Sequence, residues 1–345
     1  RNVAPPLLLR AHLARGEARR LLHDYDGARA DLNAAVELAA QLGDARYEGR
    51  AQMGLGSLAL SQGKRDGAEA QLTRALELAD HAKDNIGAGR TLALLGKVAR
   101  ARRDLELADD RCRAAVARSR AAGEKRDEGR ALVELASTLL AAQATDEAAM
   151  VAREAAAVLS KRGDRRSLVH AFGTLAIVEL DRGLFDDAEA AAARAVELGT
   201  FVGDRRAEGL YLGVRAAALH GKGQLLDARE HYTHATKVLF DAGEDAHGAL
   251  FSGALAAVHA ALDDLEHAQR CLATAQRRLA GAEAPVLAAA VGLYRGAVDV
   301  ARQREPAARR AALETLRKSV ESARRTVFAT SEDVRFAVRI TEAVR

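Results

Sequence analysis

The sequence predicts an all-α solenoid, a chain of helical hairpins in which each hairpin packs on its neighbours. The composition suits closely packed helices, because 49% of the 345 residues are hydrophobic while only 3% are aromatic, with no Trp and four Pro. An internal repeat gives the stronger evidence. Alanines recur at a strict forty-residue step, at Ala28, Ala68, Ala108, Ala148, Ala188, Ala228 and Ala268.

The first elements follow from local signals. Pro5 and Pro6 can start a helix, since the missing N–H is tolerated in the first turn, and the next helix follows a turn at residues 24–27. After that, a glycine followed by an acidic residue marks the junctions between hairpins. Each glycine can end one helix in a left-handed conformation, and each acidic residue favours the start of the next. These junctions are Gly43-Asp44, Gly123-Glu124, Gly163-Asp164, Gly203-Asp204 and Gly243-Glu244.

One hairpin of the array occupies residues 163–206, which begin and end on the same four letters, GDRR, forty positions apart. A single pair of helices cannot bury its own apolar face, so the hairpins must stack. We expect seven regular hairpins over residues 1–282 and a divergent eighth over 283–328.

The last segment, residues 329–345, is predicted to be a C-terminal capping helix that covers the open face of the last hairpin. The Ser331 hydroxyl can cap its first turn. A linker helix into a further domain is the alternative, and the lack of an initial Met suggests a piece of a longer protein. The apolar positions of the segment are Val334, Phe336, Ala337, Ile340 and Val344.

The second hairpin carries a resemblance to the tetratricopeptide repeat (TPR), at Leu55-Gly56, Ala68, Leu72 and Ala75. It departs from that pattern at Gln52, Ala59 and Asp80, where the repeat has Trp, Tyr and Pro. The long step resembles kinesin light chains, Pins-like adaptors and the TPR regions of bacterial multidomain regulators. The resemblance implies a right-handed superhelix of about eight repeats, with a concave groove that receives peptides.

No motif for chemistry is present: GxxxxGK[ST], GxSxG, HExxH and CxxC are all missing. We therefore expect no enzyme, no cofactor and no metal. His231 and His234 could offer two metal ligands at i, i+3, but we expect them to face solvent. Cys112 is predicted to be a buried, inert thiol, and it should not pair with Cys271.

The bulk properties suggest a cytoplasmic protein, because cysteines are sparse and no apolar run is long enough to cross a membrane. The net charge is +4, from 52 basic and 48 acidic residues that are interspersed along the helices, so nucleic-acid binding is unsupported.

Positions 50, 53, 57 and 60 of the repeat lie away from the packing stripe and are expected to line the groove. The first half of this face is cationic, and its candidate partner-binding residues are Arg50, Met53, Arg90, Lys97, Arg100, Arg130 and Val133. The second half is small and apolar, and its candidates are His170, Ile177, Leu210 and Leu250, with Gly173, Gly213 and Gly253 expected to admit a nearby backbone.

Two interpretations of the arginines stay open. They could pair with Glu48 and Glu128 or stack on a neighbouring helix, or they could bind an acidic segment bidentately. The apolar half should be covered by a partner, a second copy, an adjoining domain or the C-terminal helix. The predicted function is a protein-interaction module for an acidic and then apolar segment, in a larger signalling protein. The alternative is a sensory domain that binds a small molecule or short peptide and gates an attached kinase, ATPase or transcription-factor domain.

Overall fold

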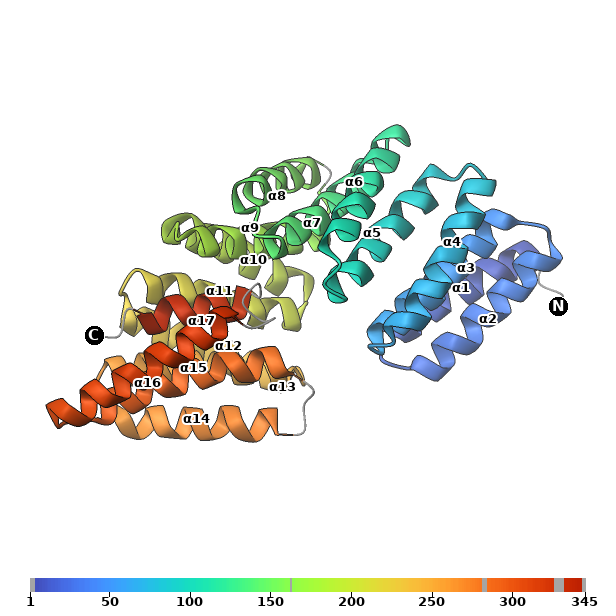
Figure 1. Cartoon of the computed structure of the whole chain (residues 1–345). Coiled ribbons are helices and arrows are strands. Elements are labelled where there is room, and N and C mark those ends of the chain that lie inside the picture. The colour runs from blue at the N-terminus through green and yellow to red at the C-terminus, as the bar shows by residue number, and fades with distance from the viewer. Residues whose placement is uncertain (1–3, 162, 281–283, 326–331, 343–345) are drawn as a thin grey trace. The chain divides into compact units, whose positions relative to one another are not determined.

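The computed structural model describes residues 4–161, 163–280, 284–325 and 332–342 (Figure 1). Over these residues every regular element is an α-helix, and none is a strand. None of the described helices combines the length and the apolar character needed to span a membrane. The chain divides into two compact units, Arg1–Leu139 (unit 1) and Leu140–Arg345 (unit 2).

Odd-numbered helices are the first helices of hairpins and even-numbered ones the second, up to α16. Unit 1 contains α1 (Pro5–Leu21), α2 (Tyr25–Gln41), α3 (Ala45–Ser61), α4 (Arg65–His81), α5 (Asn85–Ala101) and α6 (Leu105–Ala121), and α7 (Lys125–Ala141) crosses the boundary in sequence. Unit 2 contains α8 (Thr145–Ser160), α9 (Arg165–Arg182), α10 (Phe185–Val202), α11 (Arg205–Gly221), α12 (Leu225–Asp241), α13 (Asp245–Ala261), α14 (Leu265–Leu279), α15 (Pro285–Arg302), α16 (Pro306–Arg325) and α17 (Glu332–Glu342).

The repeating alanines lie at the crossing points of the hairpins. All seven, from Ala28 to Ala268, are fully buried. In the second hairpin Gly56 of α3 faces this position of α4, where an added Cβ would lie 3.4 Å from the Ala68 carbonyl oxygen and 2.6 Å from Leu72. Small residues at the crossing therefore let the two helix backbones approach closely.

The junctions between hairpins also form as predicted. Gly43 and Gly203 end their helices with φ of 66° and 71°, a left-handed conformation that glycine adopts without steric cost. The next residue caps the following helix: the Asp44 carboxylate accepts a hydrogen bond from the Tyr47 N–H at 3.1 Å, and Asp204 accepts one from the Ala207 N–H at 2.9 Å.

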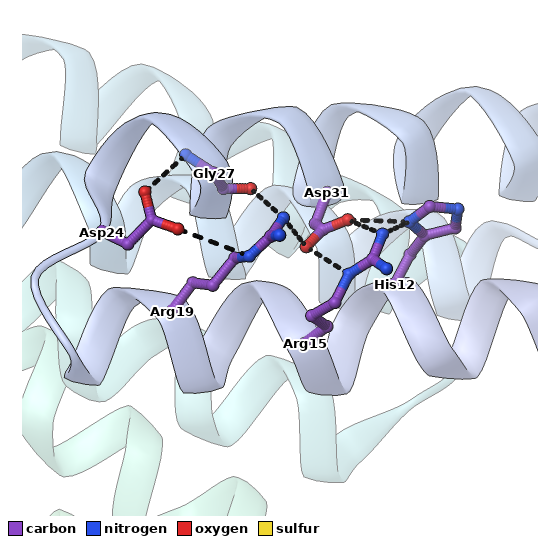
Figure 2. Close-up of polar contacts among 6 residues, drawn as sticks. All are labelled: His12, Arg15, Arg19, Asp24, Gly27 and Asp31. Carbon is purple, nitrogen blue, oxygen red and sulfur yellow. Dashed lines mark hydrogen bonds and ion pairs between the residues drawn. The ribbon is translucent and has the colours of Figure 1, made fainter.

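A buried carboxylate joins the first two helices (Figure 2). Asp31 of α2 is only 3% exposed. Its carboxylate accepts hydrogen bonds from three side chains of α1: Arg15 Nε at 2.8 Å, Arg19 Nη1 at 2.7 Å and His12 Nδ1 at 3.0 Å. The hydrogen bond from Arg15 is the largest effect that holds the pKa of Asp31 well below its usual range. Arg15 and Arg19 compensate the cost of burying this charge, so polar as well as apolar contacts hold α1 against α2.

The C-terminal helix extends further along unit 2 than an end cap would. α17 contacts α15 and α16 of the last hairpin, against which it lies in Figure 1, and it also contacts α9. Its buried residues Val334, Ala337 and Ile340 belong to the main hydrophobic core of unit 2. Of the segment's predicted features, Ser331 and Val344 lie outside the described residues.

Candidate binding groove

The first helices of unit 2 form one continuous face, because α9, α11, α13 and α15 contact one another in sequence order. This face bears the apolar half of the predicted groove. Ile177 and Leu210 are partly buried, Leu250 is 4% exposed, and His170 remains exposed. We call the part lined by Ile177, Leu180, Leu210, Leu250 and Phe251 the unit 2 groove.

Aromatic rings occupy the space above the glycines of this face. A Cβ at Gly173 would overlap the Tyr211 ring, and one at Gly213 would overlap the Phe251 ring. At Gly253 the added atom would lie 3.1 Å from the Tyr294 ring. The expectation that these glycines admit a ligand backbone is therefore wrong: each accommodates an aromatic side chain from the following first helix.

The chain itself covers part of the unit 2 groove, through α17. Arg335 Nε donates to Asp181 Oδ1 at 2.7 Å, and these side chains are only 19% and 12% exposed. Arg339 donates to the carbonyl oxygen of Leu180, at 2.8 Å, and to that of Asp181. Both contacts lie at the C-terminal end of α9, where the helix dipole favours a cation. Of the covers considered from the sequence, the C-terminal helix is the one present here.

A cavity of about 220 Å³ remains between α17 and the floor of the unit 2 groove. Five helices contribute to it, and its walls are mainly apolar, with charged groups near α17. The lining residues are Ile177, Leu180, Asp181, Leu210, Tyr211, Val214, Ala217, His247, Leu250, Phe251, Tyr294, Arg335, Phe336 and Arg339.

Two polar side chains lie within the apolar interior of unit 2. His220, at the end of α11, has its ring 6.3 Å from that of Tyr232, in an edge-on arrangement, and burial lowers the pKa of His220 to about 4. Burial also raises the pKa of Tyr232. Within the described residues neither His220 Nδ1 nor the Tyr232 hydroxyl has a hydrogen-bond partner.

The first helices of unit 1 hold most of their arginines in contacts between neighbouring hairpins. Arg90 of α5 donates to Asp127 of α7 at 2.8 Å, and Arg100 donates to Glu134 at 2.8 Å. Asp127 is 4% exposed, so this ion pair lies at the edge of the packed interior. Arg90 and Asp127 are 37 residues apart in the sequence, so this ion pair connects the first helix of one hairpin to the first helix of the next.

The remaining candidates of unit 1 are more accessible. The guanidinium of Arg50 lies 5.2 Å from the centre of the Tyr47 ring, a cation–π distance, while Glu48 pairs with Arg74 at 3.6 Å. Lys97 and Arg130 are exposed, and Met53 and Val133 are partly buried beside them. Arg50 thus stacks on a ring of its own helix and not on a neighbouring one, while Arg90 and Arg100 pair with carboxylates of the next first helix.

The cysteines and the outer histidines lie where the sequence placed them. Cys112 is fully buried at the hairpin crossing, and burial raises the pKa of its thiol to about 11. Both Cys112 and Cys271 are free thiols. His234 is exposed, and His231 donates from Nδ1 to the Asp227 carbonyl oxygen at 3.0 Å.

Sequence reasoning missed a cluster of ligand-type side chains, His259, Asp264 and His267, at the turn between α13 and α14. A signal was present in the repeat. Two histidines and an aspartate fall within nine positions at this turn, whereas the register position of His259 holds Ala59, Ala99, Leu139 and Leu219 in four other hairpins and Arg19, Glu179 and Asp299 in three.

No protein-family model matches the sequence, and no curated protein matches it. Solved structures do resemble it. A Rap protein complexed with Competence and Sporulation Factor has a TM-score of 0.64 at 12% identity, over 94% of this chain and 91% of that one. Aspartyl phosphate phosphatase F from Bacillus subtilis has a TM-score of 0.61 at 14% identity, over 79% and 70%.

A third similar structure is a Signal Transduction ATPase with Numerous Domains protein with a tetratricopeptide repeat sensor, from Pyrococcus horikoshii. Its TM-score is 0.62 at 13% identity, over 89% of this chain and 46% of that one. At these identities the likeness concerns the fold. Together with the forty-residue hairpins and their buried alanines, it shows that this chain has the fold of the tetratricopeptide-repeat proteins.

Proposed function

We propose that the chain is a protein-interaction module whose unit 2 groove binds an amphipathic helix of a partner protein. The observation that carries this proposal is the seat of α17, which places an apolar face and two arginines in the groove. α17 acts as an internal occupant, and the partner segment competes with it for the same contacts.

The chemistry of the groove specifies such a segment. Its floor is apolar, so it favours side chains such as Val, Ile or Phe. Asp181, which is 12% exposed, and the carbonyl oxygens at the end of α9 favour a basic side chain at one end of the ligand. We therefore propose a segment with apolar residues at helical spacing and arginine or lysine one turn apart.

The size of the cavity favours a peptide over a metabolite. Its volume of about 220 Å³ is below the roughly 300–1,000 Å³ typical of sites for drug-sized ligands, and it suits one or two additional side chains. A protein of similar fold also supports a role in binding a partner, since the Rap protein is complexed with Competence and Sporulation Factor. The repeats of the Pyrococcus horikoshii protein are called a sensor, and a sensory role in a larger protein is the alternative proposal for this chain.

A labelled peptide with the sequence of residues 332–342 tests this function in the full chain. Arg335→Gln with Arg339→Gln should release α17 by removing its charged hydrogen bonds to α9, whichever charge residue 181 carries, and the peptide should then bind, as measured by fluorescence anisotropy. Adding Asp181→Arg should weaken binding about 10- to 100-fold, because a partly buried charged hydrogen bond is lost. The matched control is Asp241→Arg, which changes an exposed acid at the end of α12.

A charge swap makes this test specific. A peptide carrying Arg335→Asp should recover binding to the Asp181→Arg chain and lose binding to the chain with Asp181. Equal binding of the original peptide to released chains with and without the Asp181→Arg change would overturn the proposed seat. A peptide that binds neither released chain would overturn the groove itself.

A second proposal concerns acidic segments and the first helices of unit 1. Within the described residues Lys97 is exposed and makes no ion pair. Arg50 stacks on the Tyr47 ring and also attracts the Asp84 carboxylate. Reversing Arg90 is a poor test because it would place two carboxylates together at Asp127. Lys97→Glu with Arg50→Glu should abolish binding of an acidic peptide, while Lys64→Glu, at an exposed turn, should leave it unchanged.

A further inference from the structure

The turn between α13 and α14 brings three side chains with metal-binding atoms together. His259 lies in the last turn of α13, Asp264 is the N-cap of α14, and His267 lies in the first turn of α14. One ligand atom from each residue lies within 4.8 Å of the others. The turn itself is fixed, because the Asp264 N–H donates to the His259 carbonyl oxygen at 2.9 Å.

The atoms that converge are the ones that a transition metal takes. Nδ1 of His259 lies 3.1 Å from Asp264 Oδ2, and Nδ1 of His267 lies 2.8 Å from Asp264 Oδ1. The two imidazole rings stack at 5.2 Å with an angle of 15° between them. Ligand atoms at 2.0–2.2 Å from a tetrahedral zinc ion are about 3.3 Å apart. The two imidazoles here contact different oxygens of Asp264, and one atom of each residue lies within 4.8 Å of the others, so small side-chain rotations bring all three onto one ion.

The three side chains of the cluster are buried to different degrees, as expected for a metal site at the surface. The side chain of His259 is 10% exposed, that of Asp264 34% and that of His267 53%. An ion bound here would therefore have protein ligands on its inner side and room for water on its outer side.

We propose that His259, Asp264 and His267 form a binding site for a divalent transition-metal ion, with zinc as the best fit. Two imidazole nitrogens and one carboxylate oxygen suit zinc, nickel or copper, whereas calcium and magnesium require mostly oxygen ligands. On binding, the metal replaces the hydrogen bonds that the imidazoles make to Asp264. It connects α13 to α14 and stabilises the seventh hairpin.

Titration of the tag-free full chain with Co²⁺ tests the site. Bound cobalt with nitrogen and oxygen ligands should give visible d–d absorption, which Zn²⁺ should then displace, and calorimetry should give the zinc affinity. His267→Ala should weaken zinc binding by roughly 10- to 100-fold or more, since loss of a ligand costs at least as much as loss of an outer partner. His234→Ala, at an exposed histidine of α12, is the matched control.

Asp264→Ser separates the metal site from the helix cap. Serine is a good N-cap and should maintain α14, but it lacks the carboxylate ligand. We expect this variant to melt at a somewhat lower temperature without metal, because the imidazoles lose their carboxylate partner, and to lose the rise in melting temperature that zinc produces in the original chain. Unchanged zinc affinity in both His267→Ala and Asp264→Ser, or no cobalt absorption in the original chain, would overturn the site.

Discussion

At the scale of the residue, buried polar groups differ in how far their hydrogen bonds are satisfied. In unit 1, hydrogen bonds from Arg15, Arg19 and His12 satisfy both oxygens of Asp31. In unit 2, Nδ1 of His220 and the Tyr232 hydroxyl are buried without a hydrogen-bond partner in the described structure. Since an unpaired buried polar group costs about 1–3 kcal/mol, these two side chains weaken the packing behind the groove.

His220 should therefore make the stability of the chain depend on pH. Burial lowers its pKa to about 4, compared with about 6.5 in the unfolded chain. As the pH falls from 6.5 towards 4, the unfolded chain takes up a proton that the folded chain does not, so stability decreases by up to about 3 kcal/mol. Denaturant unfolding of His220→Leu across this range should show a flatter pH dependence.

The control for this prediction is the exposed His234. His234→Leu should retain the pH dependence of the original chain, because it leaves the buried imidazole of His220 in place. If His220→Leu and the original chain lost stability in parallel between pH 6.5 and 4, the imidazole would not be buried in its neutral form.

At the scale of the element, the glycines of the first helices set how closely the hairpins of unit 2 stack. Gly213→Ala should force the Phe251 ring to move and should destabilise the chain by about 1–3 kcal/mol, as overpacking does. The matched control is Gly292→Ala in α15, where an added Cβ meets nothing within 4 Å. That change should stabilise the chain by up to about 1 kcal/mol, because alanine favours helix.

Chemical denaturation of the two variants checks the prediction. A second change, Phe251→Leu in the Gly213→Ala chain, should recover part of the lost stability, since it removes the ring that the methyl group meets. If both alanine variants were equally stable, the ring would not require the glycine.

The helices and their register could be predicted because their signals are local or strictly periodic. Ala68 and its equivalents mark the crossings, and Gly43-Asp44 and its equivalents mark the helix ends. The contacts of Arg90 could not be found among its sequence neighbours, since its partner Asp127 lies one repeat further on. The rings over Gly173 and Gly213 were missed for the same reason: they come from the following hairpin.

The C-terminal helix was one of four covers considered for the apolar half, but the sequence could not select it or place α17, because no repeat equivalent exists for this helix. Its amphipathic pattern predicts which residues are buried, and Val334, Ala337 and Ile340 are indeed buried. The pattern does not say which surface receives them. The choice of α9 depends on Asp181 and on the carbonyl end of that helix, which lie 154 to 159 residues earlier in the chain.

At the scale of the whole molecule, α17 changes how the hairpins of unit 2 depend on one another. In a solenoid each repeat contacts only its neighbours, so opening can begin at one end without disturbing distant repeats. α17 contacts both α9 and α15 and thus joins hairpins that are not adjacent. Unit 2 should consequently open as one cooperative body while α17 is seated.

Native-state hydrogen exchange can measure this coupling. Arg335→Glu with Arg339→Glu should remove the contacts of α17 to α9 and increase exchange in α9, α11, α13 and α15 together. The control is Arg278→Glu, which breaks the ion pair of Arg278 with Asp245 between the adjacent helices α14 and α13. Its effect should remain local, because it removes a contact between neighbours only. An increase in exchange confined to α17 in the double variant would mean that the helix rests on a groove already held together by its own hairpins.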